Sequence, residues 1–195
     1  MNSALKVPEE DLSVTPPALP LGDLASVPPR VWKDSEGRRF SDEHVLGWVN
    51  KTRWDKDHEY QVIVGTDSHM HGRTFRFITV ACVYKVGKGG NYFYVETYEP
   101  RESYTGNQKG NKRIKGNQKM RMFTEVAKSL EIAEFLVERA SVIPVVHIDA
   151  SPSTLKHFTS SFSDQLKGYV MAAGFECVLK PESYVANAVA DKHTK

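Results

Sequence analysis

The sequence predicts an α/β protein in which one mixed sheet of five strands is flanked by helices. Two observations predict this class. Three strand-like stretches joined by short turns come first, and such strands pair as an antiparallel meander. Helix and strand patterns then alternate towards the end of the sequence, which implies right-handed crossovers and parallel strands.

Composition indicates one globular domain without a membrane span. The 195 residues are 40% hydrophobic, enough for a single good core. No apolar stretch approaches the roughly 20 residues of a membrane span, and the first residues lack a signal-peptide pattern. Cys82 and Cys177 lie in apolar, strand-like stretches and are typical of small buried side chains in a reducing compartment. We therefore expect a soluble, cytoplasmic protein.

The first 30 residues differ from the rest. Six of the ten prolines fall within residues 1–29, where few large apolar side chains could build a core. We expect residues 1–30 to form an extended or disordered arm, a candidate contact for a protein partner, and residues 31–195 to form the domain.

Start and stop signals place the helices. Ser41 lies between Phe40 and Val45 with the spacing of a hydrophobic staple around an N-cap. Ser151 followed by Pro152 is a second helix start, and Gly174 is a stop. In chain order the predicted elements are a helix at 42–52, strands at 60–67, 74–86 and 91–98, a helix at 122–139, a strand at 142–148, a helix at 152–173, a strand at 175–179 and a helix at 182–193.

Residues 100–120 read as a basic loop. Gly-Asn-Gln-Lys occurs twice, at 106–109 and 116–119, and the stretch holds six Lys or Arg against one acid. Two interpretations stay open, a loop that contacts phosphates and one that is merely solvated. The candidate phosphate contacts are Lys109, Lys112, Arg113 and Lys115.

Acidic residues occur where the predicted strands end. Asp67 and Asp149 each close a β-branched stretch, and both reach the same sheet edge if these strands are parallel neighbours. Asp191 lies in the last helix and Glu125 in the first turns of the helix at 122–139. Taken alone, Asp67 is equally well explained as a turn residue. Carboxylates without cysteine ligands suit two Mg²⁺ or Mn²⁺ ions, which together promote phosphodiester cleavage.

Other residues near this edge are secondary candidates. Gly65, on the same strand face as Asp67, leaves room for a metal or a phosphate. Residues 69–71 (His-Met-His) are expected on a turn near the site, and His193 is either a general base or a surface histidine. The mouth of the last helix offers three candidate substrate contacts, Lys180, Ser183 and Tyr184.

Three motifs carry a family resemblance, and the last of them is the most specific. They are Gly65-Thr66-Asp67-Ser68, His147-Ile148-Asp149, and Lys180-Pro181-Glu182-Ser183-Tyr184 with Val189-Ala190-Asp191-Lys192-His193-Thr194-Lys195. From about Trp32 onward, the sequence resembles the YkuK-type branch of the ribonuclease H-like superfamily, small bacterial and phage proteins. The resemblance implies a five-stranded mixed sheet and a carboxylate site formed by Asp67, a glutamate of the helix at 122–139, Asp149 and Asp191.

Two points stay open within this resemblance. Glu125 is preferred over Glu131 because it lies nearer the helix start, although a solvated face is the common place of helical glutamates. The expected function is a Mg²⁺- or Mn²⁺-dependent nuclease acting on DNA or RNA. The alternative is a catalytically weak or inactive ribonuclease H-like module that binds nucleic acid or serves as a scaffold.

Overall fold

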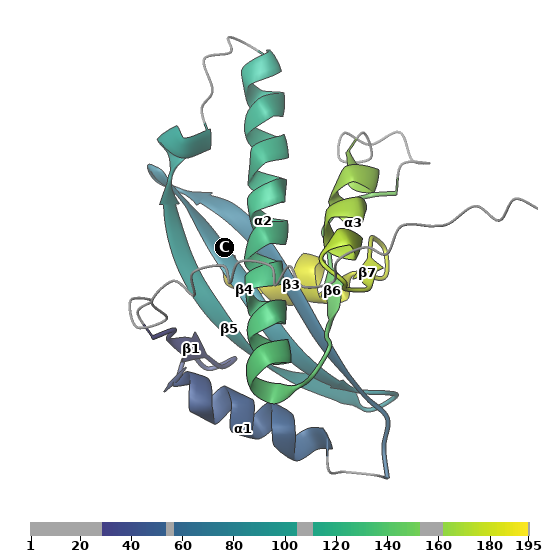
Figure 1. The fold of residues 1–195 in the computed structure, drawn as a ribbon. Helices are drawn as coiled ribbons and strands as arrows, with labels where there is room; N and C mark the ends of the chain where they lie inside the picture. Colours follow the sequence, from purple (N-terminus) through teal and green to yellow (C-terminus); the bar gives the residue numbers. More distant parts are fainter. Residues whose placement is uncertain (1–28, 54–56, 105–110, 153–161, 195) are drawn as a thin grey trace, which may run out of the picture.

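The computed structural model describes residues 29–53, 57–104, 111–152 and 162–194 (Figure 1). Most of the predicted arm at 1–30 therefore lies outside the described residues. The strands are β1 (Trp32–Lys33), β2 (Arg39–Phe40), β3 (Tyr60–His71), β4 (Thr74–Lys85), β5 (Gly89–Pro100), β6 (Val145–His147) and β7 (Cys177–Val178). The helices are α1 (Asp42–Arg53), the 3-10 helix η2 (Arg101–Tyr104), α2 (Asn111–Ala140), α3 (Ser163–Ala172), the π-helix η4 (Val185–Ala190) and α4 (Asp191–Thr194).

One mixed sheet runs through the described residues in the order β2-β1-β5-β4-β3-β6-β7. β3, β4 and β5 form the predicted antiparallel meander, and β6 and β7 run parallel to β3. The sheet has seven strands and not five, because the turn that follows Trp32 closes a small hairpin of β1 and β2 on the edge of β5. The Asp34 carboxylate holds this turn by accepting hydrogen bonds from the backbone N–H groups of Glu36 and Arg38.

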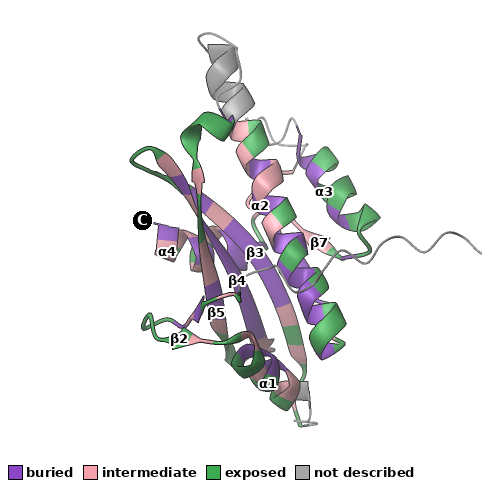
Figure 2. Cartoon of the chain, turned by 60° about the vertical axis from the view of Figure 1, so that its left-hand side comes forward, coloured by how far each residue is buried: buried purple, intermediate pink, exposed green. Residues whose placement is uncertain are grey.

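Helices cover both faces of the sheet. α1 and α2 pack on one face, where Val64 and Ala81 of the sheet meet Leu136 of α2. η4 and α4 pack on the other face, where Ile63 and Val80 lie in one cluster with Val185 and Ala190 (Figure 1). Figure 2 shows α2 buried along one side and exposed along the other, the pattern of an amphipathic helix.

Two element boundaries differ from the sequence prediction in the first half of the chain. β3 continues to His71, so residues 69–71 are in a strand and not on a turn, because pairing with β4 extends to His71 opposite Thr74. The turn is at Gly72, whose φ of 60° favours glycine. α2 begins at Asn111, so half of the expected loop at 100–120 is helical. The Lys, Arg, Gln and Met residues of that stretch favour a helix enough to tolerate Gly116.

The second half of the chain also departs in part from the prediction. Ser151 and Pro152 are not helical, and α3 starts after Phe162. The stop at Gly174 is confirmed, since this residue has a φ of 88° and its N–H donates to the Met171 carbonyl as in a Schellman cap. The expected helix at 182–193 is a π-helix followed by one turn of α-helix.

None of the helices in the described part of the chain combines the length and the apolar character needed to cross a bilayer.

Candidate active site

Alternation along β3 divides the site between the two faces of the sheet. The hydroxyl groups of Thr66 and Ser68 face α2, where Thr66 Oγ1 lies 2.7 Å from Ser129 Oγ. Ser68 Oγ donates a hydrogen bond of 2.5 Å to Glu125 Oε1. Gly65 and Asp67 face η4 and α4 instead. One strand therefore positions side chains that meet two different helices.

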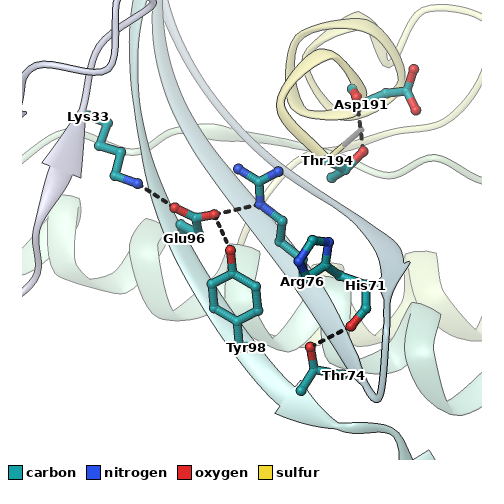
Figure 3. Close-up of polar contacts among 8 residues, drawn as sticks. All are labelled: Lys33, His71, Thr74, Arg76, Glu96, Tyr98, Asp191 and Thr194. Carbon is teal, nitrogen blue, oxygen red and sulfur yellow. Dashed lines mark hydrogen bonds and ion pairs between the residues drawn. The ribbon is translucent and has the colours of Figure 1, made fainter.

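Asp67 is held at the end of α4. Thr194 Oγ1 lies 3.0 Å from Asp67 Oδ2 and 2.9 Å from the carbonyl oxygen of Asp191 (the latter shown in Figure 3), so its one hydrogen is shared between two acceptors. Burial raises the pKa of the Asp67 carboxyl, and the nearby charge of Asp191 raises it further. The Thr194 hydroxyl and the charge of Arg121 lower the pKa again without reversing the shift. Asp67 is thus a partly buried acid whose charge is only partly compensated.

Glu125 is the buried carboxylate on the α2 side. Burial raises its pKa to about 7, and the charge of Asp67 adds to this effect. Arg121, one helical turn earlier, opposes the shift with its Nε 3.7 Å from Glu125 Oε1. Glu131 is placed differently, since its side chain is 60% exposed and pairs with Arg30 at 3.1 Å. The structure brings Glu125, and not Glu131, close to Asp67.

Asp149 follows β6 at the position the register predicts. Gly65 of β3 pairs with His147 of β6, so Asp67 and Asp149 each lie two residues further along parallel neighbouring strands. Asp149 Oδ1 is buried, and in the described part of the chain it faces a single cation. The Lys180 ammonium lies 2.5 Å from this oxygen as an ion pair. Lys180, a predicted substrate contact, therefore meets Asp149 directly.

Three of the four acids approach one another in pairs. Asp67 interacts electrostatically with Glu125 on one side and with Asp191 on the other. Within residues 29–53, 57–104, 111–152 and 162–194, however, no three His, Cys, Asp or Glu side chains are close enough to hold a metal ion as they stand. The arrangement is a chain of acids centred on Asp67, with Asp149 paired to a lysine at the adjoining strand end.

A comparison with protein families decides the relationship of this chain. The family model described as "Ribonuclease H-like" matches residues 45–195. The chain belongs to the ribonuclease H-like family. Among curated proteins it is similar to the "Uncharacterized protein YkuK" of Bacillus subtilis (strain 168), at 24% identity over 157 residues, which cover 78% of this chain and 88% of the relative. None of the solved structures gives a significant match.

The family assignment confirms the resemblance read from the three motifs, and the mixed sheet is consistent with a ribonuclease H-like fold. In this ribonuclease H-like chain the meander and the two parallel strands make up the five predicted strands, and β1 and β2 are additions at the edge.

Gly65 has a different use from the one predicted. A Cβ added there would lie 2.9 Å from the backbone nitrogen of Ala186 and 3.1 Å from its Cβ. The space above Gly65 is filled by η4 and offers no room for a metal or a phosphate. The glycine instead lets η4 pack closely on β3 and so places the end of α4 over Asp67.

The predicted substrate contacts are distributed unevenly in the ribonuclease H-like domain. Ser183 is fully buried, and its hydroxyl has no partner within the described residues. The ring of Tyr184 packs edge-on against His147 and Tyr84 and is partly exposed. Of the basic stretch, Lys109 lies outside the described residues. Lys112, Arg113 and Lys115 lie in α2, and the structure does not describe their side chains.

His193 is partly buried and packs against β5. Its ring stacks on Tyr94 with centroids 4.3 Å apart, and its Nε2 lies 2.8 Å from the Tyr92 hydroxyl. Burial lowers the pKa of this imidazole. His193 thus anchors α4 to β5.

Sequence reasoning missed three residues that position the acids. Arg121 stands four residues before Glu125, a spacing that brings two helical side chains together. Ser68 alternates with Asp67 and so reaches the opposite helix. Thr194 could be found only from the packing of α4, because 127 residues separate it from Asp67.

Proposed function

We propose that this chain is a metal-dependent nuclease that hydrolyses phosphodiester bonds of DNA or RNA with Mg²⁺ or Mn²⁺. Asp67, Glu125, Asp149 and Asp191 would hold two ions. The observation that carries the proposal is the position of Asp67, which lies between the charges of Glu125 and Asp191 and level with Asp149 on the neighbouring strand. Membership of the ribonuclease H-like family supports it.

The donor set fits a hard divalent cation. It offers only oxygen ligands from acids, with no cysteine among them. Glu125 is buried with a pKa of about 7, so ionising it without a strong counter-charge costs free energy that a bound cation would relieve. Asp149 Oδ1 is a buried acceptor that already accommodates the ammonium of Lys180.

Each residue has a separate task in this proposal. Ser68 and Thr194 hold the carboxylates of Glu125 and Asp67 through their hydroxyl groups, which restricts the rotation of both acids. Arg121 and Lys180 are positive charges beside the acids and would contact the phosphate of a bound substrate. The two metal ions, when bound, supply activation of water and stabilisation of the leaving oxygen.

The proposal is tested by incubating the purified protein with Mn²⁺ and single-stranded DNA, RNA, an RNA–DNA hybrid and branched DNA. We expect cleavage of at least one substrate and its loss in Asp67→Asn. Asp164→Asn, an exposed acid of α3, is the matched control and should cleave normally. If all four substrates stay intact, or if Asp67→Asn cleaves as well as the unaltered protein, the proposal is wrong.

A second candidate is a binding or scaffolding module with little or no catalysis. It is favoured by the ion pair of Lys180 with Asp149, and by the fact that no three acids of the described residues converge on one point. Calorimetric titration with Mn²⁺ separates the two candidates. Binding that Asp149→Ala abolishes favours the nuclease, whereas the absence of binding favours the module.

A further inference from the structure

Beyond the end of α4, the sheet face that carries Asp67 continues as a polar surface. The register places Asp67, Ile78 and Glu96 side by side on β3, β4 and β5. The next row outward consists of His69, Arg76 and Tyr98. Because alternate residues of a strand share a face, these side chains lie on the same face as Asp67. We call His69, Arg76 and Tyr98 the outer row.

Arg76 is held in this row by a hydrogen bond from one of its three guanidinium nitrogen atoms. Its Nε donates a hydrogen bond of 2.5 Å to Glu96 Oε1, while Lys33 pairs with the other carboxylate oxygen. Within the described residues, Arg76 has no other hydrogen bond or ion pair, and Figure 3 shows both Nη ends pointing away from Glu96. The two Nη atoms of this guanidinium, with their four N–H donors, are therefore available to a ligand, and the side chain is 20% exposed.

Glu96 holds this arrangement in its charged form. Burial alone would favour the neutral acid, but hydrogen bonds from Lys33, Tyr98 and Arg76 lower the pKa of Glu96 to about 2. A carboxylate that is ionised at neutral pH keeps the guanidinium of Arg76 in one orientation. Glu96 is thus a positioning residue for Arg76.

Tyr98 adds an exposed aromatic ring beside the guanidinium. Its hydroxyl donates to Glu96 Oε1 at 2.7 Å, which anchors one end of the side chain. The residue is nevertheless 51% exposed, in contrast to Tyr94 on the same strand, which is buried under His193. The ring of His71 lies edge-on to Tyr98 with centroids 6.2 Å apart. An anchored, exposed ring next to free guanidinium donors is the combination that binds single-stranded nucleic acids.

We propose that the outer row binds a single strand of nucleic acid as it approaches Asp67, with Arg76 contacting a phosphate and Tyr98 stacking on a base. This inference rests on the proposed function, because it names the form of substrate that the same site receives. A single strand fits better than a duplex since the bases of a duplex are stacked on one another and cannot cover Tyr98. The free donors of Arg76 match a phosphate and not an apolar partner.

Binding is measured by fluorescence anisotropy with a fluorescein-labelled oligothymidylate of about 12 nucleotides, in EDTA so that no cleavage occurs. We expect Tyr98→Ala to weaken binding roughly tenfold and Tyr98→Phe, which keeps the ring, to stay within about twofold. Tyr169→Ala removes an exposed tyrosine of α3 and should change nothing.

Arg76 is tested by the salt dependence of the same measurement. We expect Arg76→Gln to weaken binding several-fold and to reduce the slope of log affinity against log salt by roughly 0.7, the value for one lost contact to a single strand. Arg76→Lys should keep the slope. Arg139→Gln, an exposed arginine at the end of α2, is the matched control. Circular dichroism of each variant verifies that it is folded.

Four results would overturn the inference: no binding of the oligonucleotide by the unaltered protein, equal binding by Tyr98→Ala, tighter binding of a hairpin duplex of the same length, or a protein dimer that Tyr98→Ala dissociates. Because the assay contains no metal, a failure of cleavage leaves the result for the outer row intact. Conversely, normal cleavage with unchanged affinity in Tyr98→Ala and Arg76→Gln would refute the role of the outer row in binding. The proposed nuclease function would then remain.

Discussion

Replacing Glu125 by glutamine should stabilise the metal-free protein at alkaline pH. The side chain is buried, and its pKa is raised from 4.5 to about 7. An acid whose pKa is higher in the folded than in the unfolded chain binds its proton more tightly when folded. The free energy of unfolding therefore falls as pH rises from 4.5 to about 7 and is level above that.

The size of the effect follows from the same values. A rise from 4.5 to about 7 corresponds to about 3 kcal/mol at about 1.4 kcal/mol for each tenfold change in proton affinity. Glutamine has a similar shape, does not ionise and still accepts the hydrogen bond from Ser68. The free energy of unfolding of Glu125→Gln should therefore be higher than that of the unaltered protein by up to about 3 kcal/mol near pH 8. Near pH 5 the difference should be less than about 1 kcal/mol.

Urea unfolding in EDTA at the two pH values measures this difference. Glu134→Gln, an exposed glutamate of the same helix, is the control and should show no pH-dependent gain. Mn²⁺ added near pH 8 should stabilise the unaltered protein more than Glu125→Gln, because the variant lacks a carboxylate ligand. A Glu125→Gln variant with the same stability difference at both pH values would refute the reasoning about this buried acid.

Three further predictions concern packing, the outer row and the proposed metal site. Gly65→Ala should destabilise the protein by about 1–3 kcal/mol in urea unfolding, because the new Cβ meets η4, whereas Gly168→Ala has open space and should be neutral or stabilising; equal effects would contradict the close packing. Glu96→Gln should cost about 1–2 kcal/mol at pH 7, a loss that fades as pH falls from 4.5 towards the folded pKa of about 2; a loss independent of pH would show that its charge is not what stabilises. Lys180→Met should bind Mn²⁺ several-fold more tightly in calorimetry, because Asp149 is then released from its ion pair, and weaker binding would mean that Lys180 supports the metal site.

The sheet was largely predictable because its signals are local. Alternating residues and short turns define β3, β4 and β5, and the alternation of helices and strands after them predicts parallel strands. The level positions of Asp67 and Asp149 were expected on the condition that β3 and β6 are parallel neighbours, and the pairing of these strands meets that condition. The end of β3 was not predictable, because residues 69–71 are extended by pairing with β4 and not by their own preference.

Side-chain contacts between distant parts of the chain could not be predicted from the sequence patterns. The sequence does not show that η4 packs on Gly65, so this glycine was expected to leave open space. Nor does it show that His193 stacks on Tyr94, so this histidine was expected at the surface. Lys180 is a predicted substrate contact because it precedes a helix start, and its ion pair with Asp149 could not be read from that position. Each of these contacts joins segments that are far apart in the sequence. The periodicity of apolar residues predicts local structure and cannot predict such contacts.

The location of bound manganese tests the central claim most directly. Crystals of the protein soaked with Mn²⁺ give anomalous scattering at the metal, which identifies its ligands without relying on activity. The account predicts density between Asp67 and its neighbouring acids, with the Lys180 ammonium displaced from Asp149. A soaked crystal with no anomalous density near Asp67, and with Lys180 still on Asp149, would contradict it.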